Sequence, residues 1–203
     1  MIKSNNEETR LEAARIIDAG GTIAFRTDTF YGLGVDPFNA AALQNIFALK
    51  GREAGKPILL LIADRGDVDR FIEKRTALFD EIARRHWPGP ITLIGAARAE
   101  LPQQLTGGTN SIGVRLPQDE AVRELLRQCG GALTATSANP SGKQPPRTAQ
   151  EVQGYFTQGI DLIIDGGETS VTKPSTVLDL TGPGARLIRE GAITRADLSI
   201  LGI

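Results

Sequence analysis

The amino-acid sequence predicts a layered α/β (α+β) protein built around a mixed β-sheet. Segments with strand character alternate along the chain with segments of helical spacing. The apolar run over residues 57–63 has the length of a strand and the composition of one buried on both faces. The chain has 203 residues and no long linker. We therefore expect a single domain over residues 1–203.

Helices are expected where apolar residues recur every three to four positions. The first is expected to begin after a cap at Ser4 or Asn6 and to end at Gly20 and Gly21. Further helices are predicted over residues 41–50, within 67–85 (one or two), near 119–129, near 148–156 and after Thr194.

Strands are predicted over residues 22–25, 57–63, 91–97, 111–117, 132–138 and 161–166. The segments 175–181 and 185–190 flank a Pro-Gly turn and predict a terminal hairpin. The loops richest in Gly, Pro, Ser and Thr are residues 99–110, 139–147 and 167–174. We expect a functional site on loops of this kind.

Composition excludes several classes of protein. The net charge of −1 argues against a basic nucleic-acid binder, although a local basic cleft remains compatible with it. Cys129 and His86 are the only residues of their types, which excludes a disulfide framework and any site with two histidines. No apolar run approaches the roughly 20 residues that span a bilayer. The polar start of the chain is unlike a signal peptide, so we expect a cytoplasmic protein without membrane contact.

Three polar segments could carry chemistry. The first is RTDTFYGLG, from Arg26 to Gly34, in which hydroxyls and a carboxylate could bind a small polar substrate; a turn with capping residues is the alternative. The second places three cations around glycines, at Lys50, Arg52 and Lys56. They could clamp a polyphosphate or form a solvated helix end.

The third segment is SIGVRLP, where Ser111 and Arg115 face the same side of a predicted strand. Arg115 could bind a carboxylate with both arms of its guanidinium or pair with an acidic neighbour. Trp87 is expected to pack in the core, His86 to lie at a helix end and Cys129 to be a buried, inert thiol. No nucleophile motif is evident, so the polar clusters favour substrate positioning and charge stabilisation over covalent catalysis.

Taken in order, the motifs resemble those of the YrdC family, the threonylcarbamoyl-AMP synthases. The matching segments are RTDTFYGLG, Lys50-x-Arg52 with Lys56-Pro57, WPGPIT, SIGVRLP, TSANPSG, PST and LIREG. The resemblance implies the YrdC/RibB-like fold, a twisted mixed sheet flanked by helices with a concave, positively charged cleft. It also implies a nucleotidyltransferase that makes threonylcarbamoyl-AMP and pyrophosphate from L-threonine, bicarbonate and ATP, with Mg²⁺ accompanying the ATP and no protein metal ligand.

The resemblance further assigns residues and partners. Threonine would be held by Thr27, Arg115 and Ser175. The triphosphate would lie by the catalytic pair Lys50 and Arg52 and by Lys56, and the nucleotide side would be lined by Ser111, Thr136, Ser137, Asn139 and Arg189. The product would pass to a tRNA threonylcarbamoyl transferase complex that modifies position 37 of tRNA. Arg26 stands where the family usually has proline.

Other functions remain open at this stage. A paralogue without synthase activity could bind tRNA or double-stranded RNA through the positive cleft, and such binding would weaken steeply with salt. Carbamoyl transfer by a domain of a larger maturation enzyme is a second alternative, but the cysteine-rich modules of those enzymes are absent from this sequence. A sugar-phosphate synthase on a related fold is a third, and the acidic magnesium cluster expected there is not evident.

Overall fold

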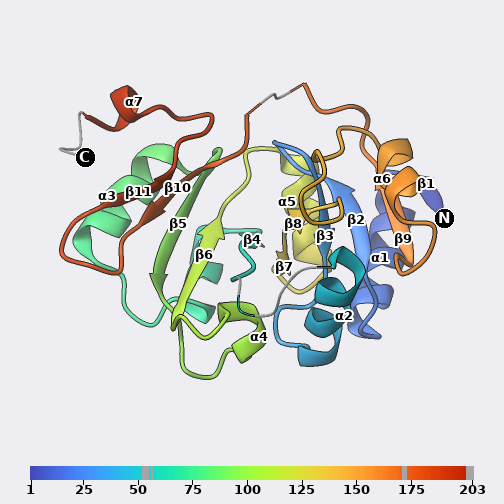
Figure 1. Cartoon of the computed structure of the whole chain (residues 1–203), viewed down its shortest axis with the longest axis horizontal. Coiled ribbons are helices and arrows are strands. Elements are labelled where there is room, and N and C mark those ends of the chain that lie inside the picture. The colour runs from blue at the N-terminus through green and yellow to red at the C-terminus, as the bar shows by residue number, and fades with distance from the viewer. Residues whose placement is uncertain (52–54, 56, 171–172, 200–203) are drawn as a thin grey trace.

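The computed structural model describes residues 1–51, 55, 57–170 and 173–199, and within these residues the strands form two mixed sheets (Figure 1). Sheet A has the order β1 (Ile2–Ser4), β9 (Leu162–Asp165), β2 (Ile23–Arg26), β3 (Tyr31–Gly34) and β8 (Thr136–Ser137). Sheet B has the order β11 (Arg186–Arg189), β10 (Thr176–Asp179), β5 (Ile91–Ala96), β6 (Ser111–Arg115), β4 (Leu60–Ile62) and β7 (Ala132–Thr134). The predicted α/β class is confirmed.

Both sheets mix parallel and antiparallel pairs. In sheet A, β9 runs parallel to β1 and β2, while β3 runs antiparallel to β2 and β8. In sheet B, β10 runs parallel to β5 and β6 runs parallel to β4, and the remaining pairs are antiparallel. The predicted terminal hairpin is the antiparallel pair β10–β11.

Short helices flank the sheets: α1 (Glu7–Asp18), α2 (Ala40–Lys50), η1 (Arg65–Arg70), α3 (Ala77–His86), α4 (Gln103–Thr106), α5 (Glu120–Gln128), α6 (Ala149–Tyr155) and α7 (Arg195–Ser199). Side chains cap several of them, as the sequence predicts for the first. Asn6 accepts a hydrogen bond from Thr9 N at 2.9 Å, and Asn39 accepts one from Ala42 N at 3.0 Å. Such caps satisfy backbone donors that the first turn of a helix leaves free.

One stretch of chain joins the two sheets. The predicted strand over residues 132–138 is interrupted at Ala135, so that β7 pairs with β4 in sheet B and β8 pairs with β3 in sheet A. Backbone bonds link this stretch to both sheets, from Thr134 N to Val35 O, just after β3, at 3.1 Å and from Ala135 N to Leu59 O, just before β4, at 2.9 Å. The strand therefore changes partners at Ala135 and ties sheet A to sheet B.

The buried side chains form two clusters, one on each face of β4. Leu60 and Ile62 point into the cluster that covers α2 and α3, whereas Leu61 points into the cluster beneath α1 and α5. The second cluster also takes Phe25 from sheet A and Leu133 from sheet B. Because successive strand residues face opposite sides, burial of both faces explains the uninterrupted apolar run over residues 57–63.

Two strands were not expected from the sequence. The predictions place a glycine-containing turn where β3 forms a central strand, and they contain no strand at β1. Gly34 explains the first difference, since a Cβ atom there would lie 2.7 Å from Phe25 Cε1, so this strand position needs a glycine. No helix within the described residues is long and apolar enough to cross a membrane.

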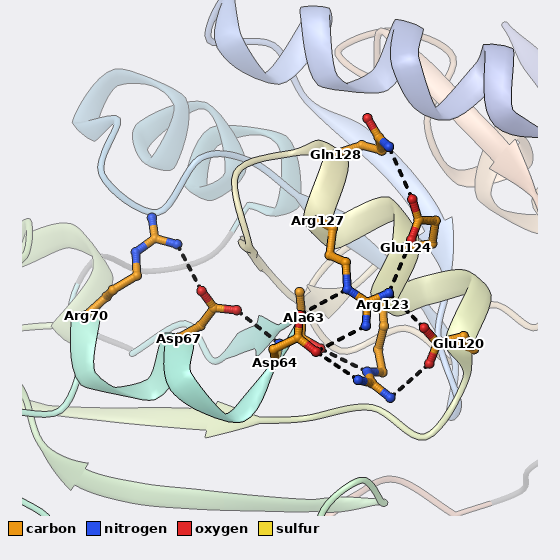
Figure 2. A network of polar contacts seen from close by, with 9 residues as sticks. All are labelled: Ala63, Asp64, Asp67, Arg70, Glu120, Arg123, Glu124, Arg127 and Gln128. Atoms are coloured by element: carbon orange, nitrogen blue, oxygen red, sulfur yellow. Dashed lines mark hydrogen bonds and ion pairs between the residues drawn. The ribbon is translucent and has the colours of Figure 1, made fainter.

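A network of charged side chains fastens η1 to α5 (Figure 2). Asp64 accepts hydrogen bonds from Arg123 Nη2 at 2.9 Å and from Arg127 Nε at 3.0 Å. The same arginines also donate to Glu120, at 2.9 and 2.7 Å. These arginines lower the pKa of the Asp64 carboxyl from 3.8 to about 2. The network lies on the surface, so its contribution to stability is modest.

Asp64→Asn is expected to lower the melting temperature at pH 7 by about 2–4 °C, because it removes about 1 kcal/mol of networked ion pairing. The depressed pKa means that this contribution is fully present above pH 3.8 and is lost as the pH falls through about 2. Thermal unfolding from pH 7 to pH 2 measures the effect. Asp69→Asn serves as control, because Asp69 pairs only with Arg75 among the described residues. Equal shifts for the two variants at pH 7 would contradict the network's role.

Candidate functional site

A cavity of about 930 Å³ lies between the two sheets. Sheet A contributes the β2–β3 turn, β3 and β8, and sheet B contributes β5, β6, β10 and β11. Its polar lining consists of Thr27, Thr29, Tyr31, Thr92, Ser111, Arg115, Thr136, Ser137, Gln144, Arg147, Ser175 and Arg189. A cavity of this volume can enclose a nucleotide and a small second substrate.

The charged side chains of this lining are all cationic. Among the described residues, the lining includes Arg115, Arg147 and Arg189 but no aspartate or glutamate. Arg115 is buried in the site, where its charge is screened little by water, whereas Arg189 lies at the more exposed β11 edge. The cavity is therefore suited to anions.

Arg115 is held at the sheet A side of the cavity. Its Nη2 lies 3.1 Å from Asp28 Oδ1, and its Nη1 donates to Thr29 Oγ1 at 3.4 Å. Burial lowers the pKa of the Arg115 guanidinium, and the charge of Asp28 opposes this shift. The ion pair with an acidic neighbour that the sequence left open is therefore present, and Arg115 also lines the cavity, so binding of a substrate carboxylate stays a prediction.

Arg189 approaches the same space from the β11 edge. Its Nε and Nη2 donate to Ser175 O at 3.1 and 2.9 Å, and Nη2 also reaches Ser175 Oγ at 3.2 Å. Ser175 Oγ lies 3.1 Å from Thr92 Oγ1. Burial lowers the pKa of Arg189, and the positive charge of Arg115 lowers it further. An anion bound between the two guanidiniums would relieve this repulsion.

The turn after β2 orders its own hydroxyls. Thr27 Oγ1 donates to Phe30 O at 2.7 Å and accepts from Thr29 N at 3.1 Å. The Thr27 hydroxyl proton is already donated to Phe30 O, so Thr29 Oγ1 must be the donor in its 3.0 Å contact with Thr27 Oγ1. Thr29 Oγ1 also accepts a hydrogen bond from Arg115. Thr27 thus shapes the turn, while Thr29 orients the guanidinium.

Lys50 closes α2 and is 4% exposed, which rules out a solvated helix end. Its Nζ donates to the backbone carbonyls of Ser137 and Asn139, the latter at 2.7 Å. Asn139 in turn donates to Lys143 O at 2.7 Å. The ammonium therefore lies directly behind the TSANPSG loop and fixes the end of β8, where Thr136 and Ser137 line the cavity.

The structure brings most of the sequence-predicted site residues together. The cavity is lined by Thr27, Ser111, Arg115, Thr136, Ser137, Ser175 and Arg189. Lys50 and Asn139 are buried behind that lining. Arg52 and Lys56 lie outside the described residues. Within the described part of the chain, no group of three or more His, Cys, Asp or Glu side chains could hold a metal ion.

Sequence reasoning passed over four residues that the site uses. Thr29 and Asp28 contact Arg115, and Thr92 contacts Ser175. Arg147 donates a hydrogen bond to Thr169 O at 2.8 Å and so connects the loop over residues 139–147 to the loop over 167–174. Thr29 and Asp28 lie inside a segment that the sequence analysis singled out, but their directions depend on the turn.

The chain matches the family model Sua5/YciO/YrdC, described as "Telomere recombination", over residues 15–191. A threonylcarbamoyl-AMP synthase of Pyrococcus abyssi is 36% identical over 193 residues, which is 95% of this chain and 57% of the relative. One of Thiobacillus denitrificans is 41% identical over 162 residues, 79% of this chain and 85% of the relative. The crystal structure of P. abyssi Sua5 complexed with L-threonine matches with a TM-score of 0.93 and 34% identity, covering 99% of this chain and 59% of that one.

Cys129 and His86 take no part in the cavity lining. His86 is the last residue of α3, as expected. Cys129 follows α5 and lies beside a second, smaller cavity of about 560 Å³. Burial raises the pKa of the Cys129 thiol to about 12, so the reactive thiolate is scarce at neutral pH.

Cys129→Ser is expected to leave the activity of the cavity unchanged, because the thiol lies outside it and is protonated at pH 7. In the unsubstituted chain, a disulfide reagent at pH 8 should modify the thiol about a hundredfold more slowly than free cysteine. Rapid modification, or a folded Cys129→Ser variant without activity, would contradict this assignment.

Proposed function

The chain belongs to the Sua5/YciO/YrdC family, and on that premise we propose that it is a threonylcarbamoyl-AMP synthase. The amine of L-threonine and bicarbonate form a carbamate with loss of water. A carbamate oxygen then attacks the α-phosphorus of ATP, and pyrophosphate leaves. The products are threonylcarbamoyl-AMP and pyrophosphate.

One observation carries the proposal: two mutually repelling guanidiniums lie in a cavity whose described lining lacks a carboxylate. Both reactants are anions, and they must approach each other. Buried cations offset that repulsion more strongly than solvated ones, because the local dielectric constant is low. The carbamate is itself the nucleophile, so the chemistry needs positioned charges and no nucleophilic side chain.

The amino-acid end of the cavity lies at Arg115. Its guanidinium can bind the threonine carboxylate, since a planar fork matches a carboxylate in two parallel bonds. Thr27 and Thr29 shape the wall beside it, and Ser175 lies across the cavity on Arg189. The crystal structure of a relative is complexed with L-threonine, which supports threonine as the substrate.

The nucleotide end lies along the remaining lining. Ser111, Thr136, Ser137 and Arg189 would face the nucleotide, with Asn139 supporting the loop behind them. Lys50, Arg52 and Lys56 would serve the triphosphate. Mg²⁺ would arrive with ATP and neutralise phosphate charge, held by phosphate oxygens and water, as Mg²⁺ commonly is in phosphoryl-transfer sites.

The product is a reactive mixed anhydride, so the proposal includes a partner transferase that moves the threonylcarbamoyl group to position 37 of tRNA. RNA binding through the cavity is the competing function. It is not favoured, because Arg115 is 3% exposed and lies beyond the reach of a polynucleotide backbone.

The direct test is pyrophosphate release from ATP and Mg²⁺ with each co-substrate omitted in turn. The expected result is release that requires both L-threonine and bicarbonate, with L-serine a poorer substrate. Release that ignores threonine, or no release from folded protein that binds ATP, would refute the synthase assignment.

Arg115→Lys is expected to raise KM for L-threonine at least about tenfold while KM for ATP changes little, because lysine keeps the charge but loses the two-armed contact. Steady-state kinetics measures both constants. Lysine also keeps a cation beside Asp28, so the substitution does not leave a buried carboxylate without a compensating charge. An unchanged KM for threonine would remove Arg115 from the amino-acid end.

A further inference from the structure

Two ion pairs connect the two short segments that carry the amino-acid end of the cavity, and each segment supplies the arginine of one pair and the aspartate of the other. In the inner pair, Arg115 of the β6 segment lies 3.1 Å from Asp28 of the β2–β3 turn. In the outer pair, Arg26 at the end of β2 lies 3.1 Å from Asp119, which follows β6. Each segment therefore supplies one arginine and one aspartate, and the two pairs join sheet A to sheet B.

The inner pair alone leaves the Arg115 guanidinium incompletely fixed. Both Asp28 carboxylate oxygens are buried without a hydrogen bond inside the described part of the structure, so the ion pair lacks hydrogen-bond geometry. Arg115 Nε is likewise buried without a hydrogen-bond partner among the described residues. The contact to Thr29 Oγ1, at 3.4 Å, is long. The position of Arg115 relative to the turn thus needs a second constraint.

The outer pair is well placed to supply it. Asp119 caps α5 by accepting from Ala121 N at 2.9 Å through Oδ1, which leaves Oδ2 for Arg26. The stem of Arg26 packs on Gly166, where a Cβ atom would lie 3.0 Å from Arg26 Cβ. Asp119 is therefore held by its capping bond and the stem of Arg26 by Gly166, while Arg26 Nε is buried without a hydrogen-bond partner among the described residues. Thr27 directly follows Arg26 in the chain, and Asp119 follows Arg115 by one short connection.

Stability does not account for the outer pair. The Arg26 and Asp119 side chains are 32% and 22% exposed, and pairs of that exposure contribute little to the free energy of folding. Substrate binding depends more strongly than stability on the position of a binding side chain, since a small displacement of that side chain can weaken binding many-fold.

We propose that Arg26 and Asp119 form a positioning pair that sets the separation between the turn carrying Thr27 and Thr29 and the strand carrying Arg115, and so the fit of the amino-acid substrate. This rests on the proposed function, since L-threonine is the substrate concerned. The pair touches no reacting atom, because neither residue lines the cavity.

The test uses Arg26→Gln, Asp119→Asn and the double variant. Glutamine keeps most of the aliphatic stem, and asparagine keeps the helix cap while removing the charge. Each single variant is expected to raise KM for L-threonine about tenfold, with kcat and KM for ATP within about twofold of the unsubstituted chain. The double variant should resemble the singles, because either change breaks the same pair. Arg26→Lys, which keeps the cation, should restore part of the loss.

Lys3→Gln is the matched control. It breaks the 2.5 Å pair with Glu12 between β1 and α1, whose side chains are 35% and 33% exposed, and Lys3 lies away from the cavity lining. The control should leave KM for threonine unchanged. Its melting temperature should shift by the same small amount as those of the Arg26 and Asp119 variants, because all of them break one partly exposed ion pair. Unchanged KM values in the Arg26 and Asp119 variants, or additive effects in the double variant, would overturn the positioning role.

Failure of the synthase assignment remains distinguishable from failure of this inference. Threonine-independent turnover by the unsubstituted chain refutes the former. Calorimetric titration with L-threonine then tests the latter: weaker binding by Arg26→Gln supports the positioning pair, and equal affinities overturn it. Absence of threonine binding by the unsubstituted chain overturns both.

Discussion

The strand over residues 132–137 is the constraint on which the cavity depends, because it belongs to both sheets. At Ala135 its pairing passes from β4 to β3, and Thr134 Oγ1 accepts a hydrogen bond from Val35 N at 3.0 Å. The strand therefore fixes the two sheets to each other, and the cavity is lined by residues of both. Thr136 and Ser137, placed just beyond the change of partner, are delivered to its wall.

The electrostatics of the site follow from that architecture. Strands β6 and β11 of sheet B bring the buried Arg115 and the more exposed Arg189 to the same cavity, where the positive charge of Arg115 lowers the pKa of Arg189. Such an arrangement is costly in an empty protein and favourable once an anion binds. Asp28 compensates Arg115 only in part, because the pKa of the guanidinium stays lowered despite the nearby carboxylate.

The sequence predicts local structure well here and side-chain direction poorly. The cap at Asn6, the hairpin β10–β11 and the buried strand β4 follow from short-range patterns, and the structure confirms them. β3 was missed because its glycines resemble a turn, although Gly34 is there to accommodate Phe25. The motifs located the cavity lining, with Ser111 and Arg115 on one strand face.

The motifs do not predict which side-chain atoms contact one another within the site. Thr27 and Thr29 are two threonines in the same short motif, and the sequence does not distinguish them, yet only Thr29 donates or accepts a hydrogen bond with the Arg115 guanidinium. Lys50 could have been a solvated helix end, but the fold buries it against the carbonyls behind β8. These distinctions arise from contacts between segments far apart in the chain, which no local pattern encodes.

We propose that buried Arg115 receives the carboxylate of the amino-acid substrate. A crystal structure of the chain with L-threonine and a non-hydrolysable ATP analogue tests it most directly. We expect the threonine carboxylate within about 3 Å of both arms of the Arg115 guanidinium, with the triphosphate in the same cavity. Threonine bound elsewhere, or with its carboxylate turned away from Arg115, would contradict it.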